Sequence, residues 1–326
     1  MRLRWSTTGH SYLDTGNNNK VVRSWKFPYG ITFPGTPTGR YSNGLIFTDL
    51  LASYIGIESP MPYTQWNKSS KRTVSNGMNF AHGATGVFDT WMKEANMTTQ
   101  INTFKQFVPE QYIADGVYNK CDLEQSVAIV ALDGNDYTQY YLVDNGTKEG
   151  FQAYVVKVLH QLELNLRELG KTGIKKVVML TMEPLGCLPN KAISLSYKKC
   201  DEQSNKETIF HNTLLQQIIQ RLRNETNDSP FHILDLYGAF MYVINKTAAE
   251  GTPITGSAKF RNPLLKPCCR PTSPDHLCGG VNDNGVKQYT LCDHPDDYFF
   301  WDFYHPTQSG WRAILSYLKP SLDEFM

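Results

Sequence analysis

The amino-acid sequence predicts one α/β domain with three layers, α/β/α, built around a mainly parallel central sheet. Three observations predict it: short apolar runs end at turn residues, longer segments between them have helical periodicity, and the two kinds alternate along the chain. The chain has 326 residues, enough for a large core, and contains no Pro/Ser/Gly tract, charge block or repeat that would mark a linker. We therefore expect a single domain over residues 1–326.

Three apolar runs have the length and composition of buried parallel strands, at residues 126–132, 175–181 and 231–236. Each ends at turn residues, and Asp133 and Gly134 follow the first run. Because ligands bind beyond the carboxyl ends of parallel strands, we expect the functional residues directly after these runs.

Four segments place apolar residues at the 3.6-residue spacing of a helix, at residues 42–56, 150–170, 202–224 and 307–322. Ser42 or Asn43 could cap the first helix, and Gly56 and Gly170 stand where C-terminal caps are expected. The alternation of strand and helix implies right-handed crossovers, and hence parallel strands with helices on both faces.

Charge and hydropathy exclude several classes of partner. Lysine and arginine number 32 against 31 acidic residues, a net charge of +1, which gives no electrostatic case for a nucleic acid or an anionic membrane. No apolar run reaches the roughly 18 residues that a membrane helix needs, so we expect no stable membrane insertion. The expected partner is a small, largely uncharged molecule.

Two features favour the secretory pathway. The first is a set of glycosylation sequons, at Asn67, Asn96, Asn145, Asn224, Asn227 and Asn245. The second is cysteine clustering, with Cys187 near Cys200, Cys121 alone, and a group formed by Cys268, Cys269, Cys278 and Cys292. This clustering favours disulfides and one spare thiol, with a zinc site as the alternative for the last four. Residues 1–8 lack the apolar stretch of a signal peptide, so we expect a secreted protein whose N-terminus is truncated or mis-started here.

Ser11 is the first candidate catalytic residue. It follows Gly9 and His10 at an expected strand-to-helix turn. A serine in such a turn can expose its hydroxyl and present its own backbone N–H to a ligand. An ordinary turn rich in Gly, Ser and Asn is the alternative interpretation.

Asp302 and His305 are the second candidate, on one short turn before the last predicted helix. At this spacing the carboxylate can hold the imidazole in one tautomer while the other ring nitrogen faces a hydroxyl. A lone histidine before proline is more often structural, and the nearby aspartate favours catalysis.

Two further segments contain possible oxyanion donors. Asn135 follows the most apolar strand and could aim its amide at a developing oxyanion, although a simple turn is the alternative. Small residues over positions 79–86, including Gly83 and Ala84, permit close approach of backbone to ligand.

Together these segments resemble the plant GDSL esterase/lipase family of the SGNH hydrolases, over essentially the full chain. The resemblance rests on ordered blocks: Asp14-Thr15-Gly16-Asn17, Pro28-Tyr29-Gly30, Gly39-Arg40-Tyr41-Ser42-Asn43-Gly44, Asn79-Phe80-Ala81, Gly134-Asn135-Asp136-Tyr137, Pro184-Leu185-Gly186-Cys187-Leu188-Pro189, Cys268-Cys269, and Phe300-Trp301-Asp302 through His305-Pro306-Thr307. It implies a three-layer fold with Ser11 as nucleophile, His305 as base and Asp302 orienting the base. The implied oxyanion donors are the N–H of Ser11, an N–H in the Gly83-Ala84 segment and the side chain of Asn135.

The implied reaction is hydrolysis of a carboxylic ester or lipid through an acyl-enzyme, without metal or organic cofactor. Two alternatives keep the fold: a catalytically weakened or inactive protein with a binding role, and an acyltransferase that uses the same triad. The α/β-hydrolase family is disfavoured, because the chain has no G-x-S-x-G motif.

Three positions depart from the family pattern. His10 replaces an aspartate beside the nucleophile, where it could compete for the hydrogen bond of Ser11 or add charge below about pH 6.5. The first strand is polar and would bury Arg4 or leave polar side chains inside the sheet. Ala84 replaces a glycine and keeps its backbone donor in place only if its φ is negative.

Overall fold

The computed structural model describes residues 4–67, 76–107, 120–225, 229–250, 260–273 and 275–324. The chain divides into two compact units, each assembled from separate stretches of sequence. The sheet unit comprises residues 1–18, 52–182 and 210–234, and the disulfide unit comprises residues 19–51, 183–209 and 235–326. A single domain over the whole chain stays a prediction.

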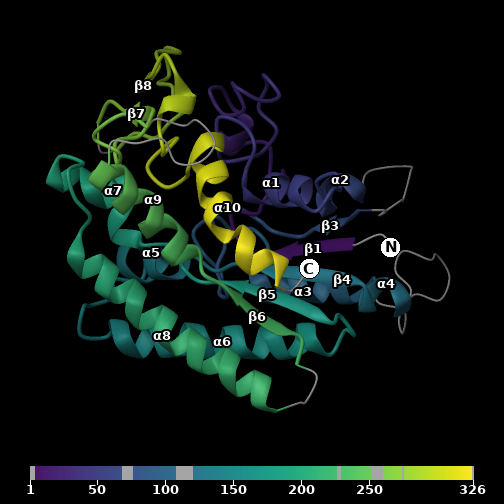
Figure 1. The fold of residues 1–326 in the computed structure, drawn as a ribbon. Coiled ribbons are helices and arrows are strands. Elements are labelled where there is room, and N and C mark those ends of the chain that lie inside the picture. The colour runs from purple at the N-terminus through teal and green to yellow at the C-terminus, as the bar shows by residue number, and fades with distance from the viewer. Residues whose placement is uncertain are drawn as a thin grey trace. The chain divides into compact units, whose positions relative to one another are not determined.

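A six-stranded parallel sheet forms the centre of the sheet unit (Figure 1). Its strands, in spatial order, are β2 (Met61–Pro62), β3 (Gly77–Asn79), β1 (Arg4–Thr8), β4 (Ser126–Val130), β5 (Lys176–Leu180) and β6 (Phe231–Leu234). Every pairing in it is parallel. Apart from the edge strand β2, this is the flavodoxin-like order, in which the strand order reverses at β1 and β4. The predicted α/β class is confirmed, and the ligand site is expected where β1 and β4 end.

The predicted strands occur where the apolar runs lie. All five residues of β4 are buried, because both faces of a parallel sheet are covered. The run over 231–236 was predicted too long: β6 ends at Leu234, since helix α9 (Leu236–Glu250) begins two residues later.

The polar first strand forms in the middle of the sheet. Trp5 of β1 lies opposite Gly77 of β3 and Val127 of β4. Thr7 and Thr8 are buried, and their Oγ1 atoms have no hydrogen-bond partner in the described part of the chain. Each such hydroxyl costs about 1–3 kcal/mol, so the polar strand is tolerated at a cost in stability. The predicted burial of the Arg4 side chain lies outside the described residues.

The long helix of the sheet unit follows the periodicity predicted for residues 150–170. Helix α6 (Phe151–Gly170) buries an apolar stripe and packs against α3 (Met97–Lys105), which also contacts β1. The remaining helices with residues in this unit are α2 (Tyr63–Trp66), α4 (Lys120–Glu124), α5 (Asn135–Leu142), the end of α1 (Phe47–Tyr54), and the C-terminal part of α8 (Glu202–Asn224).

Of the predicted caps, only Gly56 is confirmed. It has φ +77°, and the N–H of Ile57 donates to the carbonyl of Ala52 at 3.0 Å, which closes a Schellman motif. Gly170 is wrong as a cap, because it is still helical and Lys171 follows as the C-cap.

Ser42 and Asn43 do not cap α1, which begins at Phe47. They bind the start of α10 (Gln308–Asp323) instead: Asn43 Oδ1 accepts the N–H of Gln308 at 2.9 Å, and Ser42 Oγ donates to Pro306 O at 3.1 Å.

The disulfide unit combines two packed helices with a small antiparallel ribbon. Helices α9 and α10 contact each other, and the Phe240 ring of α9 meets the Trp311 ring of α10 edge-on at 6.0 Å. The ribbon pairs β7 (Cys269–Pro271) with β8 (Tyr289–Leu291). The short elements are α7 (Pro189–Ala192) and the 3-10 turns η1 (Arg23–Trp25), η2 (Leu185–Cys187), η3 (Ile193–Leu195) and η4 (Pro295–Asp297).

The clustered cysteines form disulfides, as predicted. The pairs are Cys187–Cys200, Cys268–Cys292 and Cys269–Cys278, and Cys121 is an exposed free thiol. The zinc alternative for the last four cysteines is wrong, because each of them is bonded to another cysteine.

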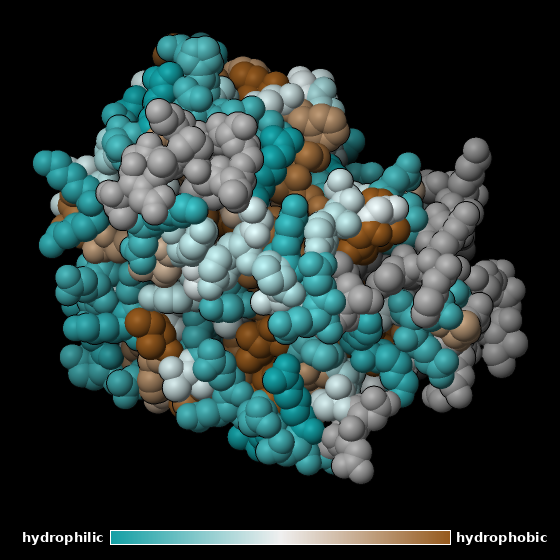
Figure 2. Space-filling model, viewed as in Figure 1, coloured by the Kyte–Doolittle hydropathy of each residue, from teal (hydrophilic) through white to brown (hydrophobic). Residues whose placement is uncertain are grey.

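The surface is largely polar. Figure 2 shows one face, on which apolar residues occur in small groups among hydrophilic ones. Within the described residues, no helix is long and apolar enough to cross a membrane. Exposed sequon asparagines are Asn67, Asn145, Asn224 and Asn245. Asn96 is half-buried and caps α3, and Asn227 lies outside the described residues.

Candidate active site

Ser11 lies in the turn that follows β1, at the carboxyl edge of the sheet. Gly9 has φ +146°, and a Cβ there would lie 2.5 Å from Ala131 O, so only glycine allows this approach. Gln100 of α3 fixes the same residue: its Oε1 accepts the N–H of Gly9 at 2.7 Å, and its Nε2 donates to Gly9 O at 3.0 Å. Ser11 is therefore held directly after the strand, with 5% of its surface exposed.

A buried carboxylate joins the Ser11 turn to the loop after β3. Asp14 Oδ1 accepts the N–H groups of Gly16 and Asn17 at 2.8 and 2.6 Å, and its Oδ2 accepts the N–H of Gly83 at 2.9 Å. Burial raises the pKa of Asp14, against the lowering effect of His82 and these N–H groups. Asp14 thus connects the Ser11 turn to the loop after β3, and its carboxylate takes up the N–H of Gly83.

Two asparagines complete this frame. Asn17 Nδ2 donates to Asn79 O at 2.8 Å and to Ala81 O at 2.9 Å, and Asn79 Nδ2 donates to Leu13 O at 2.6 Å. Sequence reasoning missed these contacts, although it singled out both motifs. The available signal was an asparagine in each of two blocks expected at the same edge of the sheet, because a polar side chain that becomes buried there needs a hydrogen-bond partner.

The Gly83-Ala84 segment, the predicted source of an oxyanion donor, lies beside the same turn. Thr85 Oγ1 donates to Gly9 O at 3.2 Å, and Asn135 Nδ2 donates to Thr85 O at 3.0 Å. Asn135 is the first residue of α5, so the alternative of a simple turn there is wrong. Among the described residues, no partner is found for the N–H of Ala84, and this residue has φ +62°. The sheet unit therefore gathers Ser11, the Gly83-Ala84 loop and Asn135 at the ends of β1, β3 and β4.

The positive φ of Ala84 leads to a stability prediction. We expect Ala84→Gly to raise the free energy of unfolding by up to about 1 kcal/mol, because the left-handed region costs an L-residue about 1–2 kcal/mol and the freedom of glycine in the unfolded chain offsets part of the gain. Urea unfolding measures the change. The control Ala153→Gly, at an exposed site inside α6, should instead lose about 1 kcal/mol. A loss in both variants would disprove strain at Ala84.

His10, one of the departures from the expected family pattern, pairs with a carboxylate. Its Nδ1 lies 2.7 Å from Asp133 Oδ2, and Asp133 Oδ1 accepts the N–H of Asn135 at 3.0 Å. His10 is 1% exposed. This buried pair joins the Ser11 turn to the segment that carries Asn135. Competition of His10 for the hydrogen bond of Ser11 stays a prediction.

Asp136 connects α5 to the loop that follows Ala84. Its oxygens accept the N–H of Val87 at 3.0 Å and of Phe88 at 3.1 Å, and it leaves no room for a Cβ on Gly86. Burial raises the pKa of Asp136 to about 7; the two N–H groups oppose the rise and Asp133 adds to it.

We expect Asp136 to make the folded protein less stable as the pH rises from about 4 to about 7. The folded state keeps this proton up to about pH 7, whereas the unfolded chain loses it near the ordinary value of 3.8. Between these values the folded state binds more protons, so a rise in pH favours unfolding. Urea unfolding of the wild type and of Asp136→Asn at several pH values isolates the contribution of Asp136. The difference between their free energies of unfolding should change by about 1.4 kcal/mol per pH unit between pH 4 and pH 7. A constant difference from pH 4 to 8 would count against it.

Asp302 and His305 meet within the disulfide unit. His305 Nδ1 lies 2.7 Å from Asp302 Oδ1, and the same oxygen accepts the backbone N–H groups of Tyr304 and His305, each at 2.9 Å. Both side chains are buried. The ring of Tyr41 stacks on the imidazole at 4.8 Å between centroids and 24° between planes. The contact expected from the three-residue spacing is present, and these neighbours fix the plane of His305.

Asp302 stays ionised despite its burial. Burial by itself would raise its pKa, but His305, Arg23 and a hydrogen bond from Tyr29 hold it well below the ordinary value. Tyr29 Oη donates to Asp302 Oδ2 at 2.6 Å. Sequence reasoning missed this role, because it considered Tyr29 as part of the block Pro28-Tyr29-Gly30, far from Asp302 in the sequence.

The predicted site residues fall into both units. Ser11, Gly83, Ala84 and Asn135 belong to the sheet unit, and the dyad of Asp302 and His305 belongs to the disulfide unit. Among the described residues, no group of three or more His, Cys, Asp or Glu side chains could hold a metal ion.

Comparison with known proteins gives a match over most of the chain. The family model described as GDSL-like lipase/acylhydrolase matches residues 8–318. A GDSL esterase/lipase of Arabidopsis thaliana is 44% identical over 96% of this chain and 85% of its own length, and another from that plant is 42% identical over 96% and 86%. Acetylajmalan esterase 2 of Rauvolfia serpentina is 29% identical over 96% of this chain and 88% of its own length.

Proposed function

The chain belongs to the GDSL-like lipase/acylhydrolase family, and we propose on this basis that it hydrolyses carboxylic esters through an acyl-enzyme on Ser11. The relatives are named esterases and esterase/lipases, which supports an ester-hydrolysing enzyme acting on a small-molecule ester. The observation that carries the proposal is the buried contact of 2.7 Å between His305 Nδ1 and Asp302 Oδ1. A histidine held in this way keeps its Nδ1 proton toward the carboxylate and offers Nε2 as a base.

The proposed reaction has two steps. Ser11 Oγ attacks the ester carbonyl while its proton passes to His305 Nε2; the bond from carbon to the alcohol oxygen then breaks, and the alcohol takes that proton. Water next attacks the acyl-enzyme, gives its proton to the same Nε2, and releases the acid as the proton returns to Ser11. Asp302 stabilises the imidazolium in both steps, which its lowered pKa supports.

The proposed oxyanion hole combines backbone and side-chain donors. They are the N–H of Ser11, the N–H of Ala84 and Nδ2 of Asn135. We assign Ala84 rather than Gly83, because the N–H of Gly83 already donates to Asp14. The positive φ of Ala84 was expected to displace its donor; we propose instead that Ala84 keeps the left-handed backbone that a glycine would adopt there, so that its N–H stays in place at a cost in strain. Asn135 Nδ2 donates one hydrogen to Thr85 O and has a second for the oxyanion. Removing one such donor costs about 100-fold or more in turnover.

Fluorophosphonate labelling of the purified protein, followed by peptide mass spectrometry, tests this function. We expect stoichiometric modification of Ser11 that is lost in His305→Ala. Absence of label in folded protein would refute the proposal and leave the inactive binding protein. If Ser11 is labelled, the acyl products formed with competing alcohols distinguish a hydrolase from an acyltransferase.

We also propose that the protein is a secreted glycoprotein. Three disulfides fit an oxidising compartment, and four sequon asparagines are exposed. The test is a loss of mass on treatment with peptide N-glycosidase of protein recovered from the medium of a eukaryotic host, and an unchanged mass would exclude glycosylation.

A further inference from the structure

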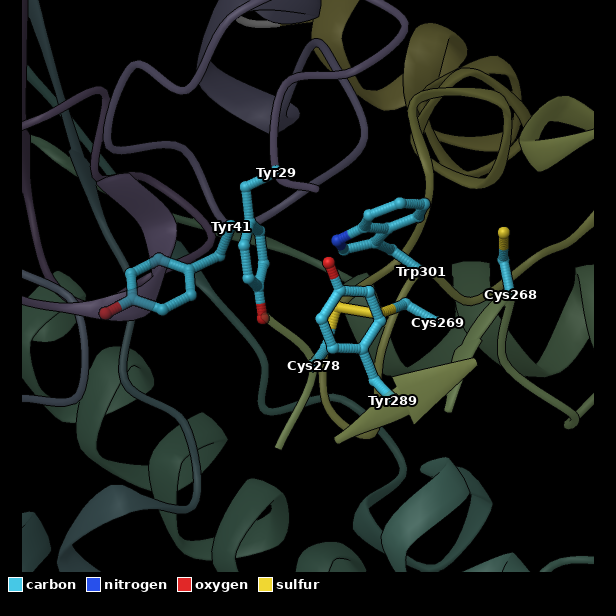
Figure 3. Packing of buried hydrophobic residues seen from close by; sticks show 7 residues of the cluster. All are labelled: Tyr29, Tyr41, Cys268, Cys269, Cys278, Tyr289 and Trp301. Carbon is cyan, nitrogen blue, oxygen red and sulfur yellow. A yellow bond between two sulfur atoms is a disulfide. The ribbon is translucent and has the colours of Figure 1, made fainter. Parts of the chain in front are cut away.

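Tyr29 occupies a fixed place behind the dyad. Its side chain is fully buried, and Figure 3 shows its ring between those of Tyr41 and Trp301. It meets them edge-on, with centroids 6.0 and 6.1 Å away and planes inclined at 78° and 73°. The ring therefore has little freedom, and its hydroxyl is held toward Asp302 at 2.6 Å.

The C-terminal disulfides brace the same region. Cys269 N–H donates to Trp301 O at 2.7 Å, and Cys268 N–H donates to Phe300 O at 3.0 Å. These hydrogen bonds attach the ribbon of β7 and β8 to the segment that ends in Asp302. The disulfide from Cys269 to Cys278 belongs to the same buried cluster as Tyr29 (Figure 3). Both partners of the hydrogen bond between Tyr29 and Asp302 are thus anchored in one cross-linked cluster.

The two oxygens of Asp302 have different partners. Oδ1 binds the imidazole and two backbone N–H groups, whereas Oδ2 accepts from Tyr29. Burial and the nearby carboxylate raise the pKa of Tyr29 well above its ordinary value, so the phenol remains a donor at every working pH.

We propose that Tyr29 is a positioning residue that sets the basicity of His305 by hydrogen bonding to the far oxygen of Asp302. The inference rests on the proposed function of the dyad. A donor on Oδ2 withdraws negative charge from the carboxylate, and this charge is what stabilises a protonated imidazole. The bond also prevents rotation of the carboxylate, and so keeps the imidazole in one orientation.

Three other charged or titratable side chains of the described residues face the dyad: Tyr41, Tyr304 and Arg23. Tyr41 stacks on His305, and Tyr304 lies edge-on to it at 6.2 Å. The guanidinium of Arg23 lies over both rings, 5.9 Å from that of Tyr41 and 5.7 Å from that of Tyr304, and lowers the pKa of Asp302 through space. Arg23 has no hydrogen bond to Asp302 among the described contacts, so Tyr29 alone can fix the carboxylate by direct bonding from its far side.

The test is the pH profile of kcat/KM for 4-nitrophenyl acetate in the full-length Tyr29→Phe variant. We expect kcat to fall by about 10-fold or more, the effect of losing a hydrogen bond to a charge. KM should change by less than about twofold. The acid limb of the profile should move up by about half a pH unit or more, because His305 becomes more basic. Tyr289→Phe, in the same cluster, is the matched control and should leave the profile in place.

A second variant keeps the test valid if Tyr29→Phe fails to fold. Incorporation of 3-fluorotyrosine in place of Tyr29 keeps the ring but makes the hydroxyl a stronger donor, so the acid limb should move down. An unmoved acid limb in a folded variant, with kcat near that of the wild type, would overturn the proposal. The proposed function fails separately, if Ser11→Ala hydrolyses the ester as fast as the wild type.

Discussion

Replacing Ser11 by alanine is expected to lower the kcat of ester hydrolysis by about 10⁶-fold, the loss that serine hydrolases show when the nucleophile is removed. Without Oγ no acyl-enzyme forms, and His305 has no proton to accept. The side chain lies in a turn whose backbone is held by Gln100 and Asp14, so the fold should persist. Initial rates with 4-nitrophenyl acetate measure the loss of kcat, and circular dichroism of the variant shows whether the fold persists.

The matched control is Ser53→Ala, an exposed serine within α1, which should leave kcat unchanged. A Ser11→Ala protein that retains kcat within about tenfold of the wild type would mean that another group attacks the ester. In that case the label on Ser11 would mark a reactive side chain without a role in turnover.

Local patterns in the sequence predicted the strands β4, β5 and β6 and the helices α1, α6, α8 and α10, but not the short strands β2, β3, β7 and β8 or helices such as α3, α5 and α9. The predicted helix over 202–224 has the same bounds as α8. The apolar spacing that predicts a helix is a property of that segment alone and needs no knowledge of the rest of the fold. Likewise the three-residue spacing of Asp302 and His305 is local, and the two side chains meet as expected.

Contacts between distant segments could not be predicted in this way. Asn43 was interpreted as the cap of α1, but its partner Gln308 lies 265 positions away, and nothing in the local pattern identifies it. The hydrogen bond from Tyr29 to Asp302 spans 273 positions. The pairing within the C-terminal cysteine group has several equally local solutions, and only the fold selects one.

The conformation of single residues was equally inaccessible. Ala84 occupies φ +62°. A glycine at this position would have indicated a positive φ, whereas an alanine gives no such indication. The polar strand β1 shows the reverse case, because its place between β3 and the apolar strand β4 decides its structure against its own composition.

Asp302→Asn is expected to lower kcat by about 10⁴-fold without unfolding the protein. The amide oxygen of asparagine can still accept the N–H groups of Tyr304 and His305. In that orientation, however, its NH₂ group stands at the position of Oδ2, where it cannot accept from Tyr29, and the neutral amide cannot stabilise the imidazolium. In the reversed orientation the NH₂ group donates to Nδ1 and leaves the imidazole proton on Nε2. That tautomer cannot take the proton of Ser11. Steady-state kinetics measure the loss, and Asp297→Asn, which only loses an exposed ion pair with Arg261, should stay within about twofold.

The loss in Asp302→Asn should persist from pH 6 to 9, because the pKa of Asp302 is lowered and the wild-type carboxylate is ionised throughout. The double variant with Ser11→Ala is the sharper measurement. Groups that act as one unit have effects that do not add, so its kcat should equal that of Ser11→Ala alone. A further loss of about 10⁴-fold in the double variant would mean that Asp302 acts independently of Ser11, and the two residues could not belong to one triad.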